Sequence, residues 1–218
     1  MRTTAISLLA LLLLFVIAFA WMPYSKQGKK IIALYGPDIK KEYLLSSGTV
    51  NELKMKSSKA KLFIRQNDFD TSFCFMIDLS LPSNHKRFFV YDMKKDSATA
   101  SGLVTHGNCN EYWLEGKKYG NAVGCGCSSL GKYKVGNSYY GKFGLAYKLH
   151  GLEKTSSNAY RRYVVLHSHE CVPDVEVQRE ICQSNGCPTV SPSFLKHLQT
   201  VISQSRKPIL LWIYGEKL

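Results

Sequence analysis

The amino-acid sequence predicts a mainly β domain, a sandwich or barrel of strands with one or two short helices. Short runs of strand-forming residues recur along the chain, each bounded by Asn, Asp, Ser or Pro residues that favour turns. The 218 residues include 13 Tyr, 10 Phe and 3 Trp, a composition that favours strands and excludes a disordered, collagenous or coiled-coil chain. Only one segment carries a strong helix signal.

The N-terminus resembles an export signal. Arg2 precedes an apolar run over residues 5–20, and Ala18-Phe19-Ala20 has the small-x-small pattern at which a signal peptidase cleaves. We therefore predict that residues 1–20 form a signal peptide. A retained membrane anchor is the alternative, because the run approaches the length of a spanning helix when the next two residues are included. In both cases we expect the rest of the chain in the periplasm or the cell-wall space.

The mature chain divides into an extension and a folded domain. Residues 21–60 are Lys-rich and mixed, and we interpret them as an N-terminal extension or linker with a weak helical segment at 38–45. Residues 61–218 are predicted to fold as one domain. The stretch 107–140, rich in Gly, Asn, Ser and Tyr, is expected to form long surface loops. Strands are expected at residues 61–65, 72–79, 87–92, 102–105, 143–149, 162–166 and 208–214.

The one strong helix signal lies near the C-terminus. Ser191 can cap a helix and Pro192 can occupy its first position. Apolar residues then recur at helical spacing on one face of residues 193–203. We expect this helix to pack on the sheet.

The charge indicates an anionic partner. The chain has 29 Lys and Arg against 16 Asp and Glu, a formal net charge of +13. This charge is spread along the sequence and is not gathered in a basic tail, so we expect no nucleic-acid partner in an exported chain. Anionic cell-envelope polymers are the expected partners. A membrane contact is expected only if the N-terminal segment stays uncleaved.

The cysteine count predicts disulfides and at least one thiol outside them. Disulfides persist in an oxidising compartment, and an odd number of cysteines leaves one unpaired or bridged to another chain. The residues alone favour three disulfides and one spare thiol without choosing the pairing. The seven cysteines are Cys74, Cys109, Cys125, Cys127, Cys171, Cys182 and Cys187.

Two residues together suggest nucleophilic catalysis. The strand predicted at 162–166 brings His167 to its end, and Ser184-Asn185-Gly186-Cys187-Pro188 forms a turn before the capped helix. An imidazole can accept the proton of a thiol and so produce the nucleophilic thiolate. Gly186 permits a tight turn that directs backbone amides at a developing oxyanion. The competing interpretation is a disulfide at Cys187 and a core histidine at His167.

Five sequence blocks, of which the last is this pair, follow one another in a fixed order. They are Val104-Thr105-His106-Gly107, Ser128-Ser129-Leu130-Gly131, Tyr140-Gly141-Lys142-Phe143-Gly144, Gly151-Leu152-Glu153 with Asn158-Ala159 and Arg162, and the pair His167 and Cys187. Together they resemble one subgroup of the murein L,D-transpeptidases with the YkuD-type catalytic domain, over about residues 61–214. Two positions depart from the family pattern, because Thr189 stands where an Arg is common and Ser168 where a Gly is frequent.

The resemblance implies that residues 61–218 form a catalytic domain for acyl transfer on peptidoglycan stem peptides. Cys187 would attack the carbonyl of the third stem residue, His167 would pass the thiol proton to the leaving D-Ala, and amides near Gly186 would hold the oxyanion. The resulting thioester would go to the amine of a neighbouring stem, giving a 3-3 cross-link. Transfer to water, an L,D-carboxypeptidase reaction, is the alternative. The chemistry needs neither a metal nor an organic cofactor.

The resemblance also suggests residues that contact the substrate and disulfides that brace the site. Because Thr189 replaces the family Arg, Arg161, Arg162 and Arg179 are candidates to bind the substrate carboxylate, and a solvated basic face is the competing interpretation of each. Cys109, Cys125 and Cys127 are expected to brace the site loops, and Cys171 with Cys182 to clip the loop between the two catalytic residues. The expected substrate-binding residues are Arg162, Ser184, Asn185, His106 and Asn158.

Two non-enzymatic alternatives remain from the residues alone. His167, His169 and Cys171 alternate along one strand face, and Cys182 or Cys187 could complete a four-coordinate zinc site. A zinc site leaves the ordered upstream blocks unexplained. The second alternative is a wall-binding protein of the same fold without catalysis.

Overall fold

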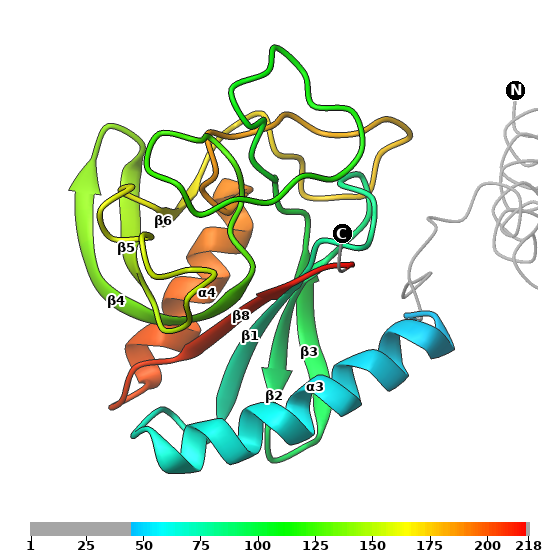
Figure 1. Ribbon diagram of the computed structural model, residues 1–218. Helices are drawn as coiled ribbons and strands as arrows, with labels where there is room; N and C mark the ends of the chain where they lie inside the picture. Colours follow the sequence, from blue (N-terminus) through cyan, green and yellow to red (C-terminus); the bar gives the residue numbers. More distant parts are fainter. Residues whose placement is uncertain (1–44, 217–218) are drawn as a thin grey trace, which may run out of the picture. The chain divides into compact units, whose positions relative to one another are not determined.

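The computed structural model describes residues 45–216, and eight strands in it form one mixed sheet with two helices. The mainly β fold class is thereby confirmed. The strand order is β3-β2-β1-β8-β4-β5-β6-β7 (Figure 1). The elements are α3 (Ser47–Gln66), β1 (Phe73–Asp78), β2 (Phe88–Asp92), β3 (Ser97–Gly102), β4 (Gly131–Gly141), β5 (Gly144–Gly151), β6 (Val165–Ser168), β7 (Thr189–Val190), α4 (Pro192–Gln204) and β8 (Leu210–Tyr214).

The sheet curls until its edges meet. Most neighbouring strands are antiparallel, but β1 with β8 and β6 with β7 run parallel. Strands β3 and β7 are the two edges, and Val104, directly after β3, makes an antiparallel bridge to Val190 of β7. The architecture is therefore an almost closed barrel, and α4 packs against β6 (Figure 1).

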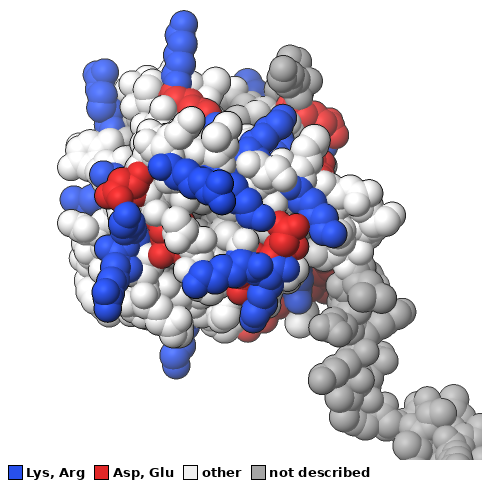
Figure 2. Space-filling model, turned by 90° about the horizontal axis from the view of Figure 1, so that it is seen from below, with Lys and Arg blue, Asp and Glu red and all other residues white. Residues whose placement is uncertain are grey.

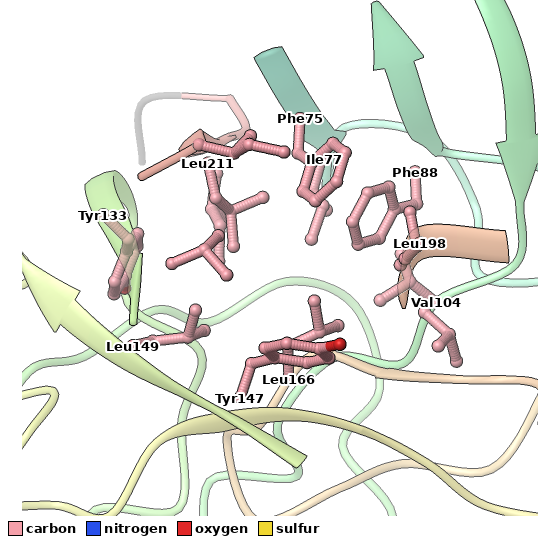
Figure 3. Packing of buried hydrophobic residues seen from close by; sticks show 14 of the residues in the cluster. Phe75, Ile77, Phe88, Val104, Tyr133, Tyr147, Leu149, Leu166, Leu198 and Leu211 are labelled. Carbon is pink, nitrogen blue, oxygen red and sulfur yellow. The ribbon is translucent and has the colours of Figure 1, made fainter. Parts of the chain in front are cut away.

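The register of β5 and β6 decides which side chains enter the core. Tyr147 pairs with Leu166, and both side chains are buried in the main hydrophobic cluster (Figure 3). Side chains alternate across a strand, so the neighbouring pairs, Ala146 with His167 and Lys148 with Val165, face the opposite side of the sheet. His167 therefore lies on the face away from the core.

Helix α4 begins where the sequence predicts it. Ser191 is the N-cap, its hydroxyl accepts a hydrogen bond from the Phe194 N–H, and Pro192 opens the helix. Leu195, Leu198 and Val201 are buried against the sheet. The predicted helix at 193–203 is confirmed.

The strand predicted at residues 61–65 is wrong, because these residues form the last turns of α3. The apolar run Leu62-Phe63-Ile64 resembles a strand when it is considered alone. The buried residues of the helix are Leu53, Ser57, Ala60 and Ile64, which lie three or four positions apart along one face. Because two of these buried positions hold Ser and Ala, the strongly apolar residues alone do not show the helical period.

The loop predicted over residues 107–140 is wrong in its last third. Residues 131–141 belong to β4, which pairs with β8 and β5. Gly131, Tyr133 and Val135 are buried on the core side of this strand, so tertiary pairing overrides the glycine- and serine-rich composition. The strand predicted at 102–105 is also displaced, since β3 ends at Gly102 and Val104 makes only an isolated bridge.

The remaining strand predictions are confirmed with small shifts. Strands β1, β2, β5 and β8 overlap the segments 72–79, 87–92, 143–149 and 208–214. Strand β6 begins only at Val165, because residues 160–163 form a turn. Figure 2 shows Lys and Arg side chains scattered over one face among uncharged side chains and fewer acidic ones.

The predictions for the N-terminal region stay untested. The signal segment at 1–20 lies outside the described residues, as does the weak helix at 38–45 apart from Leu45. Within residues 45–216, neither helix combines the length and the apolar character that crossing a membrane requires.

Candidate active site

The parallel pairing of β6 and β7 brings His167 and Cys187 into one pocket. His167 pairs with Thr189, and Cys187 lies two residues before Thr189 in the turn that enters β7. Both residues line a cavity of about 260 Å³. The other lining residues are Thr105, Phe143, His169, Cys171, Cys182, Gln183, Ser184, Asn185 and Thr189.

The hydrogen bonds of His167 define its tautomer. Nδ1 lies 3.0 Å from the Ser168 carbonyl oxygen, which can only accept, so Nδ1 carries the proton. Nε2 lies 3.1 Å from the Thr189 hydroxyl and is left as the basic nitrogen. The ring stacks on Phe143 with 4.4 Å between centroids. Burial lowers the pKa of His167 below its ordinary value, the Ser168 hydrogen bond opposes this shift, and His169 adds to it. The imidazole is therefore neutral at pH 7.

Cys187 carries a free, partly buried thiol. Its Sγ accepts from the Val165 N–H at 3.5 Å and donates to the Tyr163 carbonyl at 3.8 Å. Burial raises the pKa of Cys187, while the Val165 N–H and the positive charge of Arg162 partly offset the rise. No hydrogen bond joins Sγ to the His167 ring among residues 45–216, and the resting pair is a neutral thiol beside a neutral imidazole.

Three hydroxyl groups converge on the backbone of the nucleophile candidate. The Cys187 carbonyl accepts from Ser184 at 2.6 Å, from Thr105 at 3.2 Å and from Thr189 at 3.4 Å. Thr189 also contacts Nε2 of His167. One side chain therefore links the backbone of Cys187 to the basic nitrogen of His167, and this position is one at which the sequence departs from the family pattern.

Gly186 is required by the backbone geometry. Its φ of 100° lies in a region that side-chain-bearing residues rarely adopt, and an added Cβ would lie 2.5 Å from the Cys127 carbonyl oxygen. Its N–H donates to the Ser184 hydroxyl at 3.2 Å. The tight turn predicted at Gly186 is present, but its amide is engaged within the turn and not free to bind an oxyanion.

Arg162, the candidate for binding a substrate carboxylate, does not line this pocket. Its guanidinium donates to the carbonyls of Gly120 and Cys127 and to the Ser129 hydroxyl. These acceptors lie on the loops that precede β4, so Arg162 clamps the loops beside the site. The described pocket lining contains no arginine, which also leaves out Arg161 and Arg179.

Asn158 and His106 also lie outside the pocket. Asn158 donates from Nδ2 to the Asn121 carbonyl at 2.9 Å and fixes one loop to another. The His106 ring is buried, with Nδ1 3.1 Å from a guanidinium nitrogen of Arg87. Burial and the charge of Arg87 lower the pKa of His106 to about 4. Its carbonyl accepts from the Ser184 N–H, so His106 supports the site loop through its backbone.

Two disulfides stabilise the loops around the pocket. Cys171–Cys182 is the predicted clip across the loop between His167 and Cys187, and it forms part of the pocket wall. Cys109–Cys127 braces the loops before β4. The expectation of three disulfides is wrong, because Cys74, Cys125 and Cys187 are free.

The zinc alternative is wrong for the ligand set that suggested it. Cys171 and Cys182 are bonded to each other, so neither offers a thiolate to a metal. No group of three or more His, Cys, Asp or Glu side chains within residues 45–216 is arranged to hold a metal ion.

Several pocket residues were not identified from sequence. Thr105 and Phe143 occur in the ordered blocks, but their side chains carry no catalytic signal of their own. Thr189 is visible only as a departure from the family pattern. Gln183 lies directly before the turn at Ser184 and has no sequence signal.

Comparisons with known proteins identify the family of the domain that holds this pocket. The profile of the L,D-transpeptidase catalytic domain matches residues 46–214. None of the curated proteins compared matches the chain significantly.

Three solved structures are similar over part of the chain. An L,D-transpeptidase from Xylanimonas cellulosilytica is 14% identical over 66% of this chain and 61% of its own, with a TM-score of 0.36. The helical cell shape determining protein Pgp2 from Campylobacter jejuni is 11% identical over 78% and 56%, with a TM-score of 0.36. An L,D-transpeptidase from Stackebrandtia nassauensis is 13% identical over 78% and 69%, with a TM-score of 0.39.

This chain spans less than two thirds of the Xylanimonas and Campylobacter structures. The family assignment rests on the profile, which covers most of the sequence and includes both pocket residues His167 and Cys187. The chain belongs to the family of L,D-transpeptidase catalytic domains, whose members modify peptidoglycan.

Proposed function

We propose that this protein is an exported, cysteine-dependent L,D-transpeptidase that acts on peptidoglycan stem peptides. The observation that carries the proposal is a free Cys187 thiol and a neutral His167 imidazole in the wall of one pocket. Both positions match those at which the sequence blocks place the family's nucleophile and base. The two disulfides support a site in an oxidising compartment.

The hydrogen bonds suggest the order of proton transfer. On substrate binding, the Cys187 side chain turns from the Tyr163 carbonyl toward Nε2 of His167, and the Thr189 hydroxyl turns from Nε2 to the Cys187 carbonyl. Nε2 accepts the thiol proton as Sγ attacks the carbonyl of the third stem residue. Nδ1 stays bonded to the Ser168 carbonyl, so Nε2 also returns the proton to the leaving amine of D-Ala. A thioester on Cys187 and free D-Ala result.

The raised pKa of Cys187 indicates that the thiol is protonated before the attack. The thiolate forms as the attack proceeds and is not stored as an ion pair with His167. The thioester then passes to the amine of a second stem, which forms a 3-3 cross-link, or to water, which completes a carboxypeptidase cycle. The basic surface suits a substrate embedded in an anionic envelope polymer (Figure 2).

Intact-mass spectrometry of the protein with a tetrapeptide stem tests the proposal. We expect a covalent adduct, mapped by peptide digestion to Cys187, with one D-Ala released for each adduct formed. Cys187→Ala should abolish the adduct, and Cys125→Ala, which removes another free and partly exposed thiol, should leave it unchanged.

Adding a second stem with a free side-chain amine then distinguishes the two fates of the thioester. Dimers with a 3-3 linkage indicate transfer, and tripeptide alone indicates hydrolysis. The absence of any adduct, or an adduct that survives Cys187→Ala, would contradict cysteine catalysis at this site.

A further inference from the structure

A second cavity lies beside the candidate nucleophile. Its volume is about 350 Å³, and it is lined by Tyr139, Lys148, Tyr160, Tyr163, Val164 and Val165. This size falls in the range of pockets that bind small organic groups. None of these residues lines the pocket that contains Cys187 and His167. We call this second cavity the tyrosine groove.

The tyrosine groove and the candidate catalytic pair share one face of the sheet. Lys148 pairs with Val165, and Ala146 pairs with His167, so these side chains lie on the side away from the core. Figure 3 shows the alternating residues Tyr147 and Leu166 inside the core. Sγ of Cys187 contacts the backbone of Tyr163 and Val165. A ligand in the groove would therefore lie next to a substrate held at Cys187.

The tyrosines of the groove are exposed. Tyr163 is 84% exposed, Tyr160 57% and Tyr139 38%. Tyr163 also has a positive φ of 55°, a backbone conformation that costs free energy in a residue with a bulky side chain. Exposed aromatic clusters of this kind mark binding surfaces more often than chance placement.

One cation lies among these rings. Nζ of Lys148 is 5.9 Å from the ring centroid of Tyr139 and 5.8 Å from that of Tyr160. No acidic residue lines the groove, and no described carboxylate is within ion-pair distance of Lys148. The positive charge of Lys148 therefore disfavours an ammonium group here, and Lys148 and the tyrosine hydroxyls offer hydrogen-bond donors to neutral or anionic oxygens.

We propose that the tyrosine groove binds the saccharide backbone of the polymer whose stem peptide reacts at Cys187. This inference rests on the proposed function for the identity of the polymer. A pyranose ring has an apolar C–H face that packs on a tyrosine ring, and its hydroxyl and acetamido oxygens accept hydrogen bonds from Lys148 and the tyrosine hydroxyls. The acceptor stem is the poorer occupant, because its attacking amine is an ammonium group in solution and Lys148 disfavours it.

Saccharide binding would help the reaction without touching its chemistry. A glycan held in the groove keeps the attached stem near Cys187 and raises its effective concentration there. The groove would therefore affect KM for substrates that carry the sugar and leave kcat unchanged.

The direct test is binding of chitotetraose, an N-acetylglucosamine tetramer without peptide, measured by calorimetry and by NMR on the full chain. We expect wild-type protein to bind it and Tyr160→Ala to weaken binding by about tenfold. Tyr160→Phe keeps the ring and should retain binding. Lys148→Gln should weaken binding by about threefold. Tyr112→Ala, which removes a fully exposed tyrosine outside the groove, is the matched control and should have no effect.

The kinetics of the reaction with two donor substrates provide a second test of the saccharide proposal. Tyr160→Ala should raise KM for a disaccharide-tetrapeptide by about tenfold and leave KM for the free tetrapeptide unchanged. Absence of chitotetraose binding, or an equal effect on both donors, would overturn the saccharide assignment. Binding of a stem peptide that carries a free amine but no sugar to the groove would also overturn the saccharide assignment. Because chitotetraose binding needs no reaction, a failed adduct on Cys187 with intact saccharide binding would contradict the proposed function and not the groove.

Discussion

The sheet and the loops at its end are held together by different forces. The sheet surrounds a continuous hydrophobic cluster in which side chains such as Phe75, Phe88 and Leu198 are fully buried (Figure 3). The loops over residues 103–130 and 169–188 gather at one end of the molecule (Figure 1). They carry both disulfides, the groups that accept hydrogen bonds from Arg162, and the Ser184 and Thr105 hydroxyls that donate to the Cys187 carbonyl.

This difference follows from the need for a pocket. A loop that lines a cavity cannot bury all its side chains, so directional hydrogen bonds and covalent links must replace hydrophobic burial in fixing it. Substitutions in the sheet and substitutions in the loops should therefore have different effects. Changes in the sheet lower the free energy of unfolding, whereas changes in the loops alter the reaction more than their cost in stability suggests.

The largest loss of stability is expected in the sheet. Phe88 packs edge-on against Phe75 and Phe194, with centroids 5.6 and 5.3 Å apart. Phe88→Ala should lower the free energy of unfolding by about 3–5 kcal/mol, measured by urea denaturation. Phe88→Leu, which keeps more of the buried volume, should cost less. The acylation rate per folded molecule should be unchanged. An acylation rate that falls at constant stability would contradict the expected difference between sheet and loop substitutions.

The disulfides should show an intermediate effect that differs between the two pairs. Replacing either pair by serines should lower the free energy of unfolding by about 2–4 kcal/mol. Cys171–Cys182 lines the pocket and Cys109–Cys127 does not. Loss of Cys171–Cys182 should therefore raise KM for the stem peptide more than loss of Cys109–Cys127 does. Equal kinetic effects would show that the pocket wall is set by other contacts.

The smallest effect is expected at Thr189. Thr189→Val keeps the shape of the side chain but removes the hydroxyl between Nε2 of His167 and the Cys187 carbonyl. We expect a loss of about 1 kcal/mol in transition-state stabilisation, about a fivefold lower kcat/KM. Thr189→Ser keeps the hydroxyl and should retain the wild-type rate. A wild-type rate in Thr189→Val would remove Thr189 from the positioning of the pair.

Local signals in the sequence were sufficient for some elements and not for others. Helix α4 is predicted because Ser191 and Pro192 mark its start and its apolar residues keep a helical period. Helix α3 is missed because Ser57 and Ala60 occupy two of its buried positions. Strand β4 is missed because its pairing with β8, from Gly131 with Ile213 to Lys134 with Leu210, is distant in sequence, depends on the whole fold and leaves no local pattern.

The same limit applies to the site. The meeting of His167 and Cys187 in one pocket could be predicted because a strand end and a glycine turn each present a reactive side chain. The hydrogen bonds of Arg162 could not be predicted, because its acceptors lie on loops whose positions depend on the two disulfides and on β4. The contact of Thr189 with His167 could not be predicted, because it depends on the β6–β7 register that pairs the two residues.

The pH dependence of Cys187 acylation tests the central claim most directly. The folded-state pKa of His167 lies below its ordinary value of 6.5, so the base stays competent at neutral pH and is lost as the pH falls through that lowered pKa. We predict an acid limb below pH 6.5 in the wild-type acylation rate. His167→Gln should reduce the rate by about 10²- to 10⁴-fold and abolish that limb. A His167→Gln protein that keeps both the rate and the acid limb would contradict the account.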